Sequence, residues 1–189
     1  MSERKSELLD AAIQYLVEHG LADLSLRPLA ARIGTSARLL VFHFKSRERL
    51  IEQVLDEVQV RLQASFATIA AAPRSRQISP MKLFWQWATH RRNLPYLRLM
   101  YEAHFIALQN PRVYARYLEQ ATFNWVELIE ARLPIALRSK ATATLCAAVF
   151  DGLVIELLGS GDLRCTTRAL DEFVEMLAAR NQTAIRKDQ

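Results

Sequence analysis

Apolar residues recur every three or four positions through most of the chain, and no long stretch alternates apolar and polar residues. Such spacing is typical of amphipathic α-helices rather than of strands. Residues 3–19 carry the first clear example, an apolar face that ends before Gly20. The members of this face are Leu8, Leu9, Ala12, Ile13, Leu16 and Val17. The pattern therefore predicts an all-α protein.

Capping residues divide the following part of the chain into further helices. Ser25 can cap a short second helix that ends at Gly34. A third short helix begins near Ser36, and Ser46 caps a long fourth helix that the polar residues 72–79 close. The apolar positions of the fourth helix are Leu50, Val54, Val58, Leu62, Phe66 and Ile69. Two short helices between two longer ones are thus expected near the N-terminus.

Prolines mark the later helices. A capping residue followed by proline favours a helix start, because the first helical N–H has no partner within the helix. The chain has two such pairs, Ser79-Pro80 and Asn110-Pro111. The last two helices are predicted over residues 139–158 and 167–180. The expected total is nine helices, with no internal repeat.

Composition favours a globular protein and disfavours membrane-spanning and disulfide-rich classes. Of the 189 residues, 51% are hydrophobic, which is enough for a sizeable core. The first residues contain no apolar stretch of signal-peptide type, and Asp151 and Glu156 interrupt the apolar run near the C-terminus, so no membrane span is expected. Cys146 and Cys165 have no metal-ligand spacing and form no disulfide framework. These features favour a cytoplasmic protein with reduced thiols.

A tight turn at Gly34-Thr35 joins the second and third predicted helices, and the first helix is placed to brace both. This order is typical of a helix-turn-helix, whose second short helix enters the major groove of DNA. The surrounding motif consists of Gly20, Ser25, the Leu29-Ala30 pair, Ser36, Leu40, the His43-Phe44 pair, Ser46, Arg47 and Leu50. On this motif, residues 1–50 resemble the N-terminal domain of the TetR family of one-component transcriptional regulators. An Asp151-Gly152-Leu153 triplet, frequent in the eighth helix of that family, supports the resemblance.

The resemblance implies that the chain is divided into two functional domains. Residues 1–46 are expected to form the helix-turn-helix DNA-binding domain, and residues 47–189 a helical effector-binding and dimerisation domain. The implied function is that of a ligand-responsive repressor, which binds a palindromic operator in double-stranded DNA as a homodimer. A small-molecule effector would then release it. The net charge of +5 suits a nucleic-acid partner.

Several side chains of the N-terminal region are candidates for contacts with DNA. Arg27 and Arg38 are long enough to reach guanine edges, which is the commonest specific pairing. Ser25 at the start of its helix, Lys45 and Arg47 are candidates for phosphate contacts. The alternative for Arg27 and Arg38 is that both are solvated surface residues.

The resemblance also implies which residues form the exposed part of the recognition helix. These are Ser36, Ala37, Arg38, Leu39, Val41 and Phe42. His43 stands where the family commonly contacts a phosphate, and Phe44 is expected in the core. Val41 departs from the family pattern, since an aromatic residue usually occupies that position and valine cannot donate a hydrogen bond to a phosphate. Exposed Leu39, Val41 and Phe42 suit contacts with thymine methyl groups.

Aromatic residues are concentrated in the second half of the chain. Small-molecule pockets combine apolar and aromatic walls with a few polar groups, so some of these residues are candidates for a cavity among helices four to eight. The candidates are Phe66, Trp85, Met100, His104, Phe105 and Trp125. The alternative is that they pack in the core. Arg91 and Arg92, in a segment without acidic residues, could neutralise an acidic effector, although solvated arginines are the preferred interpretation.

Small residues repeat every four positions in the eighth predicted helix, at Thr144, Ala148 and Gly152. Such a strip allows another helix to approach closely. By the resemblance, it belongs to a four-helix dimer interface together with residues of the ninth helix. Those residues are Leu170, Phe173, Val174 and Leu177. Packing within one chain would explain the strip equally well.

The sequence carries no sign of catalysis. No pair among the four histidines has a metal-ligand spacing, and the chain lacks a nucleophile elbow, a phosphate-binding glycine loop and a dinucleotide fingerprint. We therefore expect no enzyme, metal or cofactor. The alternative function is that of a constitutive or architectural DNA-binding protein whose helical half serves only for dimerisation.

Overall fold

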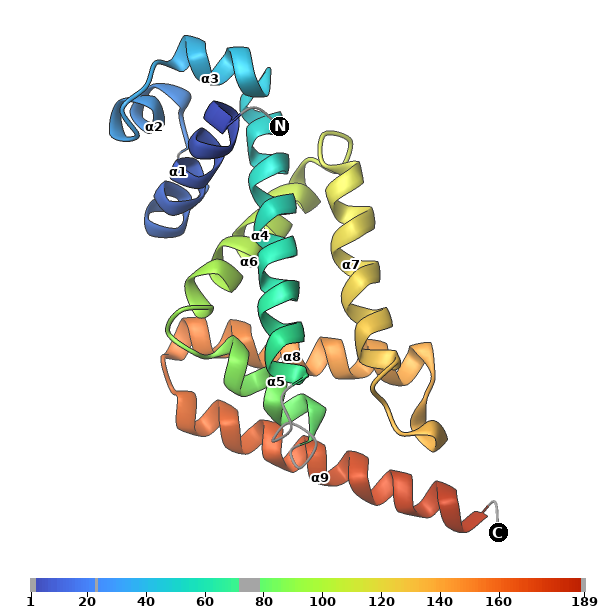
Figure 1. Cartoon of the computed structure of the whole chain (residues 1–189). Coiled ribbons are helices and arrows are strands. Elements are labelled where there is room, and N and C mark those ends of the chain that lie inside the picture. Colours follow the sequence, from blue (N-terminus) through green and yellow to red (C-terminus); the bar gives the residue numbers. More distant parts are fainter. Residues whose placement is uncertain (1–2, 23, 72–78, 188–189) are drawn as a thin grey trace. The chain divides into compact units, whose positions relative to one another are not determined.

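The computed structural model describes residues 3–22, 24–71 and 79–187. Over these residues the chain forms nine α-helices and a short 3-10 helix, and no strand (Figure 1). The elements are α1 (Glu3–His19), α2 (Leu26–Arg32), α3 (Ala37–Phe44), α4 (Arg47–Ala70), α5 (Pro80–Ala88), α6 (Leu94–Gln109), α7 (Ala115–Glu130), η2 (Ile135–Leu137), α8 (Lys140–Ser160) and α9 (Leu163–Lys187). The predicted all-α fold class is confirmed.

The chain divides into two compact units. The first unit comprises Met1–Ser65 and Arg91–Glu119, and the second comprises Phe66–His90 and Gln120–Gln189. α4 begins in the first unit and ends in the second. The compact units therefore do not coincide with the functional division predicted at residue 46, because α6 and most of α4 pack with the N-terminal helices.

In the first unit, α1 packs against α2 and α6, and α2 packs against α3 (Figure 1). The core between these helices consists of large aliphatic side chains and one aromatic ring. Its fully buried members include Leu8, Ile13, Leu16, Leu29, Leu40, Phe44 and Leu50. Phe44 lies in the core, as the sequence predicts. The burial of these side chains fixes the orientation of α3 against α1 and α2, which decides which side of α3 faces solvent.

The turn between α2 and α3 depends on a glycine. Gly34 has a φ of 69°, in the left-handed region that favours glycine. The N–H of Gly34 bonds to the carbonyl of Ala31 at 3.4 Å, and the N–H of Thr35 bonds to that of Ala30 at 2.8 Å. This pair of bonds is a Schellman motif, which terminates α2 sharply and allows α3 to begin only a few residues later.

Three polar contacts tie α6 to the C-terminal part of α1. The Nε2 of Gln14 donates to the hydroxyl of Tyr96 at 3.1 Å, and a guanidinium nitrogen of Arg98 donates to the carbonyl of Val17 at 2.8 Å. The backbone N–H of Leu21 donates to the carboxylate of Glu102 at 3.0 Å. α6 is thus a structural support of the first unit.

In the second unit, α9 packs along α8 and also contacts α5 and η2. The rings of Phe84 and Phe150 lie 4.4 Å apart, and Trp85 packs edge-on against Phe150 at 5.9 Å. The indole N–H of Trp85 donates to the hydroxyl of Thr167 at 2.9 Å. This aromatic cluster joins α5, α8 and α9 into the core of the unit.

Two predicted helix starts are wrong. α7 begins at Ala115 rather than at Pro111, because the residues after Asn110 form a turn first. α9 begins at Leu163 rather than at residue 167, since the carboxylate of Asp162 accepts a bond from the N–H of Cys165 at 3.0 Å and so caps the helix earlier. α9 also continues to Lys187, beyond the predicted end.

α8 is apolar around most of its circumference. By length and composition alone it could cross a membrane, although only 33% of its apolar stretch is buried within the chain. The core helix of a water-soluble protein passes the same test. The exposed side of α8 includes Thr144, Ala148 and Gly152, the strip of small residues in the sequence. A large part of an apolar helix therefore remains uncovered in the isolated chain.

Candidate functional site

α3 has a buried face and an exposed apolar face. The hydroxyl of Ser36 accepts a bond from the N–H of Leu39 at 3.1 Å and caps the helix. Leu40 is buried in the first unit, whereas Val41 is 44% exposed and Phe42 is 67% exposed. Large apolar side chains on the surface of so short a helix are typical of a contact surface. The structure thus exposes Val41 and Phe42, as the sequence analysis expects for a recognition helix.

Basic side chains flank these apolar residues. Arg38 is exposed, and its neighbour Ala37 is half-buried. His43 is half-buried, with its ring edge-on to Phe42 at 5.1 Å. Lys45 ends α3 with a φ of 73°, and its ammonium donates to the carbonyl of Phe42 at 3.2 Å. Arg38 and Lys45 therefore place positive charge beside the exposed apolar surface.

The N-terminus of α2 exposes two further candidates. Ser25 occupies the N-cap position with extended backbone, and its hydroxyl makes no capping bond to α2. Both Ser25 and Arg27 are exposed. A hydroxyl that does not cap its own helix is available to an external acceptor such as a phosphate oxygen.

Arg47 has a structural role that the sequence did not reveal. Its Nε donates to the carbonyl of Leu24 at 2.8 Å, and another nitrogen lies 3.8 Å from the carboxylate of Glu48. Tyr114 lies close enough to interact with the guanidinium: burial raises the pKa of the Tyr114 hydroxyl, and Arg47 opposes that rise. Arg47 thus ties the start of α4 to the loop before α2. Its Nε is not free for the predicted phosphate contact.

Replacing Arg47 with methionine should destabilise the first unit. Arg47→Met leaves the partly buried carbonyl of Leu24 without its donor, which costs about 1–3 kcal/mol. Urea unfolding without DNA measures this loss. The matched control is Arg4→Met, whose guanidinium pairs with Glu7 at 2.9 Å on an exposed surface and which should change the unfolding free energy by less than about 0.5 kcal/mol. Equal stability of the two variants would show that the bond to Leu24 contributes nothing.

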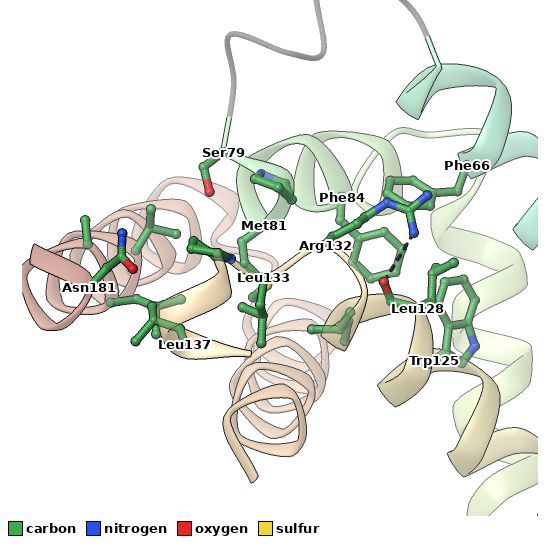
Figure 2. A pocket seen from close by; sticks show the side chains of 16 residues that line it. Phe66, Ser79, Met81, Phe84, Trp125, Leu128, Arg132, Leu133, Leu137 and Asn181 are labelled. Atoms are coloured by element: carbon green, nitrogen blue, oxygen red, sulfur yellow. Dashed lines mark hydrogen bonds between the residues drawn. The ribbon is translucent and has the colours of Figure 1, made fainter. Parts of the chain in front are cut away.

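The second unit contains a cavity of about 280 Å³ (Figure 2). Its wall is formed by the end of α4, by α5, by α7 with the following turn and η2, and by α9. The lining residues are Phe66, Ser79, Pro80, Met81, Phe84, Trp125, Leu128, Ile129, Arg132, Leu133, Pro134, Leu137, Val174, Leu177, Ala178 and Asn181. Aromatic and aliphatic side chains predominate, as they do in small-molecule sites.

Two polar residues of the wall stand out. The guanidinium carbon of Arg132 lies 5.6 Å from the centre of the Phe66 ring, and one of its nitrogens donates to the carbonyl of Leu128 at 3.2 Å (Figure 2). The Oδ1 of Asn181 is buried and has no hydrogen-bond partner among the described residues. A buried unpaired oxygen is costly, and such a group calls for an explanation.

The structure brings together only part of the predicted cavity wall. Phe66 and Trp125 line the cavity. Trp85 does not, because its side chain is buried in the aromatic core and bonds to Thr167. The other candidates lie on α6 in the first unit: Met100, His104 and Phe105. Met100 and His104 are half-buried in that unit, where the ring of His104 lies against that of Tyr117, and Phe105 is 54% exposed.

Arg132 and Asn181 line the cavity but were not among the residues predicted from the sequence. Arg132 follows the apolar pair Leu128-Ile129 at helical spacing, which is the one signal that could have placed it beside an apolar wall. Arg91 and Arg92, the arginines considered for an acidic effector, belong to the first unit and are exposed. The cation of the cavity comes from a different part of the chain.

The predicted dimer residues divide into two sets. Thr144, Ala148 and Gly152 are exposed on α8, and a Cβ added at Gly152 would meet no described atom within 4 Å. On α9, by contrast, Leu170 is only 1% exposed, and Val174 and Leu177 line the cavity. Phe173 is half-buried. The expectation for Leu170 needs correction, because α9 turns this side chain into the core of its own unit.

Thiols and acidic groups form no further site in the described part of the chain. No cluster of three or more histidine, cysteine, aspartate or glutamate residues that could hold a metal occurs among these residues. Cys146 is buried, and burial raises the pKa of its thiol, whereas Cys165 is exposed. Both thiols are free.

Residues 8–54 match the family model of bacterial regulatory proteins of the tetR family. No curated protein sequence matches the chain at a significant level. Solved structures share its fold. A Rhodococcus protein described as a TetR-family transcriptional regulator has a TM-score of 0.73 at 21% identity, with 94% of this chain and 99% of that chain covered. A TetR-family member from Streptomyces coelicolor has a TM-score of 0.66 at 23% identity, with 90% and 98% covered.

The multidrug binding protein EbrR, in complex with proflavin, is similar to this chain at 25% identity and a TM-score of 0.62, with 93% of this chain and 99% of that chain covered. Further EbrR complexes contain ethidium and imidazole. The N-terminal match covers the helix-turn-helix of α2 and α3, and the shared fold extends over nearly the whole chain. Residues 8–54 thus match the tetR family model, and the described chain shares the fold of solved TetR-family structures.

Proposed function

We propose that the protein is a cytoplasmic, ligand-responsive repressor that binds a palindromic operator as a homodimer. The observation that carries the proposal is the exposed surface of α3, where Phe42 and Val41 lie beside Arg38. In a helix-turn-helix this surface enters the major groove. An arginine there reads guanine, and apolar side chains contact thymine methyl groups.

Positive charge around α3 supports the same surface. Arg27, Lys45 and the uncapped hydroxyl of Ser25 are exposed and suited to phosphate oxygens, which position a reading helix without adding sequence information. His43 is available for the same role through its ring nitrogens. Arg47 remains a predicted phosphate contact through its other guanidinium nitrogens, and its Nε holds the start of α4 against Leu24. The proposed base-reading set is therefore Arg38 with Val41 and Phe42.

We propose that the exposed side of α8 packs against a second copy of the chain. Two-thirds of the apolar stretch of this helix are not buried within the chain, and Leu145 and Ile155 are exposed on the same helix as the small-residue strip. Small residues at Ala148 and Gly152 allow close approach of a symmetry-related helix. In a two-fold dimer, the two α3 helices would meet successive turns of DNA, about 34–36 Å apart.

The cavity of the second unit is the proposed effector site. Phe66, near the end of α4, lines the cavity, and Arg47, in the first turn of the same helix, bonds to the loop before α2. A ligand that favours one position of α4 would therefore act on the DNA-binding helices through a continuous element, provided that it binds the two states unequally. The presence of this cavity favours a sensor over a constitutive architectural protein.

An Arg38→Ala variant tests the DNA-reading role. Binding-site selection should show loss of preference at one or two positions in each half-site, since a good base contact contributes about 1–3 kcal/mol of discrimination. The matched control is Arg32→Ala, an exposed arginine at the end of α2. It should weaken binding to all sequences alike, through the salt-dependent term only. An unchanged consensus in Arg38→Ala would reject Arg38 as a base reader.

A further inference from the structure

The charged and polar side chains of the cavity wall indicate the sign of the charge that a ligand would carry. Among the described residues that line the cavity, Arg132 is the single charged one, and Ser79 and Asn181 are the only other polar side chains. No described lining residue is acidic. On α9, the carboxylate of Asp171 pairs with the ammonium of Lys82 at 2.6 Å. The cavity therefore has a positive wall without a compensating carboxylate.

The guanidinium of Arg132 already lies over an aromatic ring of the cavity wall, which is the position that a cationic ligand would occupy. This ring is that of Phe66, which packs edge-on against Phe84 at 4.7 Å. Trp125 lies 5.2 Å from Phe84 in the same cluster. An organic cation that stacked on these rings would lie close to the guanidinium of Arg132, which is solvent-exposed, and the two positive charges would repel each other. This arrangement disfavours cationic ligands.

A ligand anion would instead complement Arg132. Only one guanidinium nitrogen of Arg132 is bonded to Leu128 in the cavity wall, and the group carries several further N–H donors. Arginine binds a planar carboxylate through two parallel bonds. The rings of Phe84 and Trp125 beside it offer faces and edges to an aromatic ligand. The volume of 280 Å³ holds a molecule of about ten non-hydrogen atoms, at about 30 Å³ for each water-sized atom.

We propose that the cavity binds a small aromatic carboxylate, with its carboxylate on Arg132 and its ring among Phe66, Phe84 and Trp125. Asn181 lies at the opposite end of the labelled wall from Trp125 (Figure 2). Its unpaired Oδ1 therefore lies outside the proposed carboxylate and ring positions. The inference rests on the proposed effector site and specifies the chemical class of the effector. It differs from the cationic dyes proflavin and ethidium found with EbrR.

Benzoate, benzamide and benzamidinium test the proposal, because they share size and shape and differ in charge. Calorimetric titration of the purified full-length protein should give the order benzoate, benzamide, benzamidinium, with benzoate bound about tenfold or more tightly than benzamide. Tightest binding of benzamidinium, equal affinities or no binding of any of the three would overturn the proposal.

Variants locate the effect at Arg132. Arg132→Gln should bind benzoate and benzamide alike, and Arg132→Lys should restore part of the preference for benzoate. The matched control is Arg164→Gln, an exposed arginine in the first turn of α9 that does not line the cavity, and it should behave as wild type. Circular dichroism and melting curves check that each variant folds. A preference for benzoate that survives in Arg132→Gln would contradict the assignment.

Binding to DNA distinguishes this inference from the proposed function. The test uses the sequence that binding-site selection gives for the unliganded protein. If benzoate binds at Arg132 but does not release this DNA, the ligand class stands and the effector role fails. If DNA is bound specifically but no carboxylate binds, the regulator stands and the ligand class fails.

Discussion

A Gly152→Leu variant is expected to fold as a monomer and to lose most of its affinity for a palindromic site. A Cβ at Gly152 meets no described atom of its own chain within 4 Å, so the leucine fits the isolated protomer. It also removes a glycine from a helix interior, which favours α8 by about 1 kcal/mol. In a dimer with close helix contact at this position, each leucine would overpack the interface, which costs about 1–3 kcal/mol of dimer stability. Two-fold symmetry places the substitution in the interface twice.

The dimer should therefore weaken by about 2–6 kcal/mol, or at least about thirtyfold in dissociation constant. Light scattering over a range of concentrations measures the assembly, and circular dichroism should show unchanged helix content. The matched control is Ala136→Leu, which adds an apolar side chain at an exposed position of η2, outside α8. A dimer that is unchanged in Gly152→Leu, or a wild-type protein that is monomeric, would remove this interface.

The N-terminal fold could be predicted from the sequence because its determinants are local. Ser36 caps α3 and Gly34 ends α2 through bonds to residues at most five positions away. The burial of Leu40 and Phe44 follows from their spacing of four on one helix face. These features also decide that Val41 and Phe42 face outward. The candidate DNA surface was therefore accessible to sequence analysis.

The cavity wall could not be predicted in the same way. Helical spacing shows that Leu170, Val174 and Leu177 share an apolar face of α9, but it does not show which neighbour that face contacts. The structure turns this face toward the cavity and the core of the second unit. The same ambiguity affected α6, which packs against α1 and leaves Phe105 exposed rather than in a cavity wall. Contacts between elements distant in sequence decide both cases.

Arg47 illustrates a further limit of sequence reasoning. A basic residue at the start of a helix next to a DNA-binding motif suits a phosphate contact, and its sequence position allows no other conclusion. The bond to Leu24 becomes visible only once the chain folds back over the intervening residues. Polar contacts over such separations, including that between Leu21 and Glu102, hold the first unit together. Their contribution to stability can be measured at Gly20.

Gly20→Ala is expected to destabilise the first unit by about 2–5 kcal/mol, from two separate causes. The φ of 77° lies in the left-handed region, where a residue with a Cβ costs about 1–2 kcal/mol. The new Cβ would also lie 2.8 Å from a carboxylate oxygen of Glu102. That oxygen accepts a bond from the N–H of Leu21, so the carboxylate cannot withdraw without breaking this bond at a cost of about 1–3 kcal/mol.

The matched control separates the two causes. Gly34 has a similar φ of 69°, and a Cβ there would meet no described atom within 4 Å, so Gly34→Ala measures backbone strain alone. Urea unfolding of both variants gives the difference that belongs to Glu102. In a double-mutant cycle, Glu102→Ala should remove this difference and leave only the strain of Gly20→Ala. A loss in Gly20→Ala no larger than in Gly34→Ala would show that α6 does not hold the end of α1 through Glu102. The support of the DNA-binding helices by α6 would then depend on apolar packing and on the bond from Arg98 to Val17.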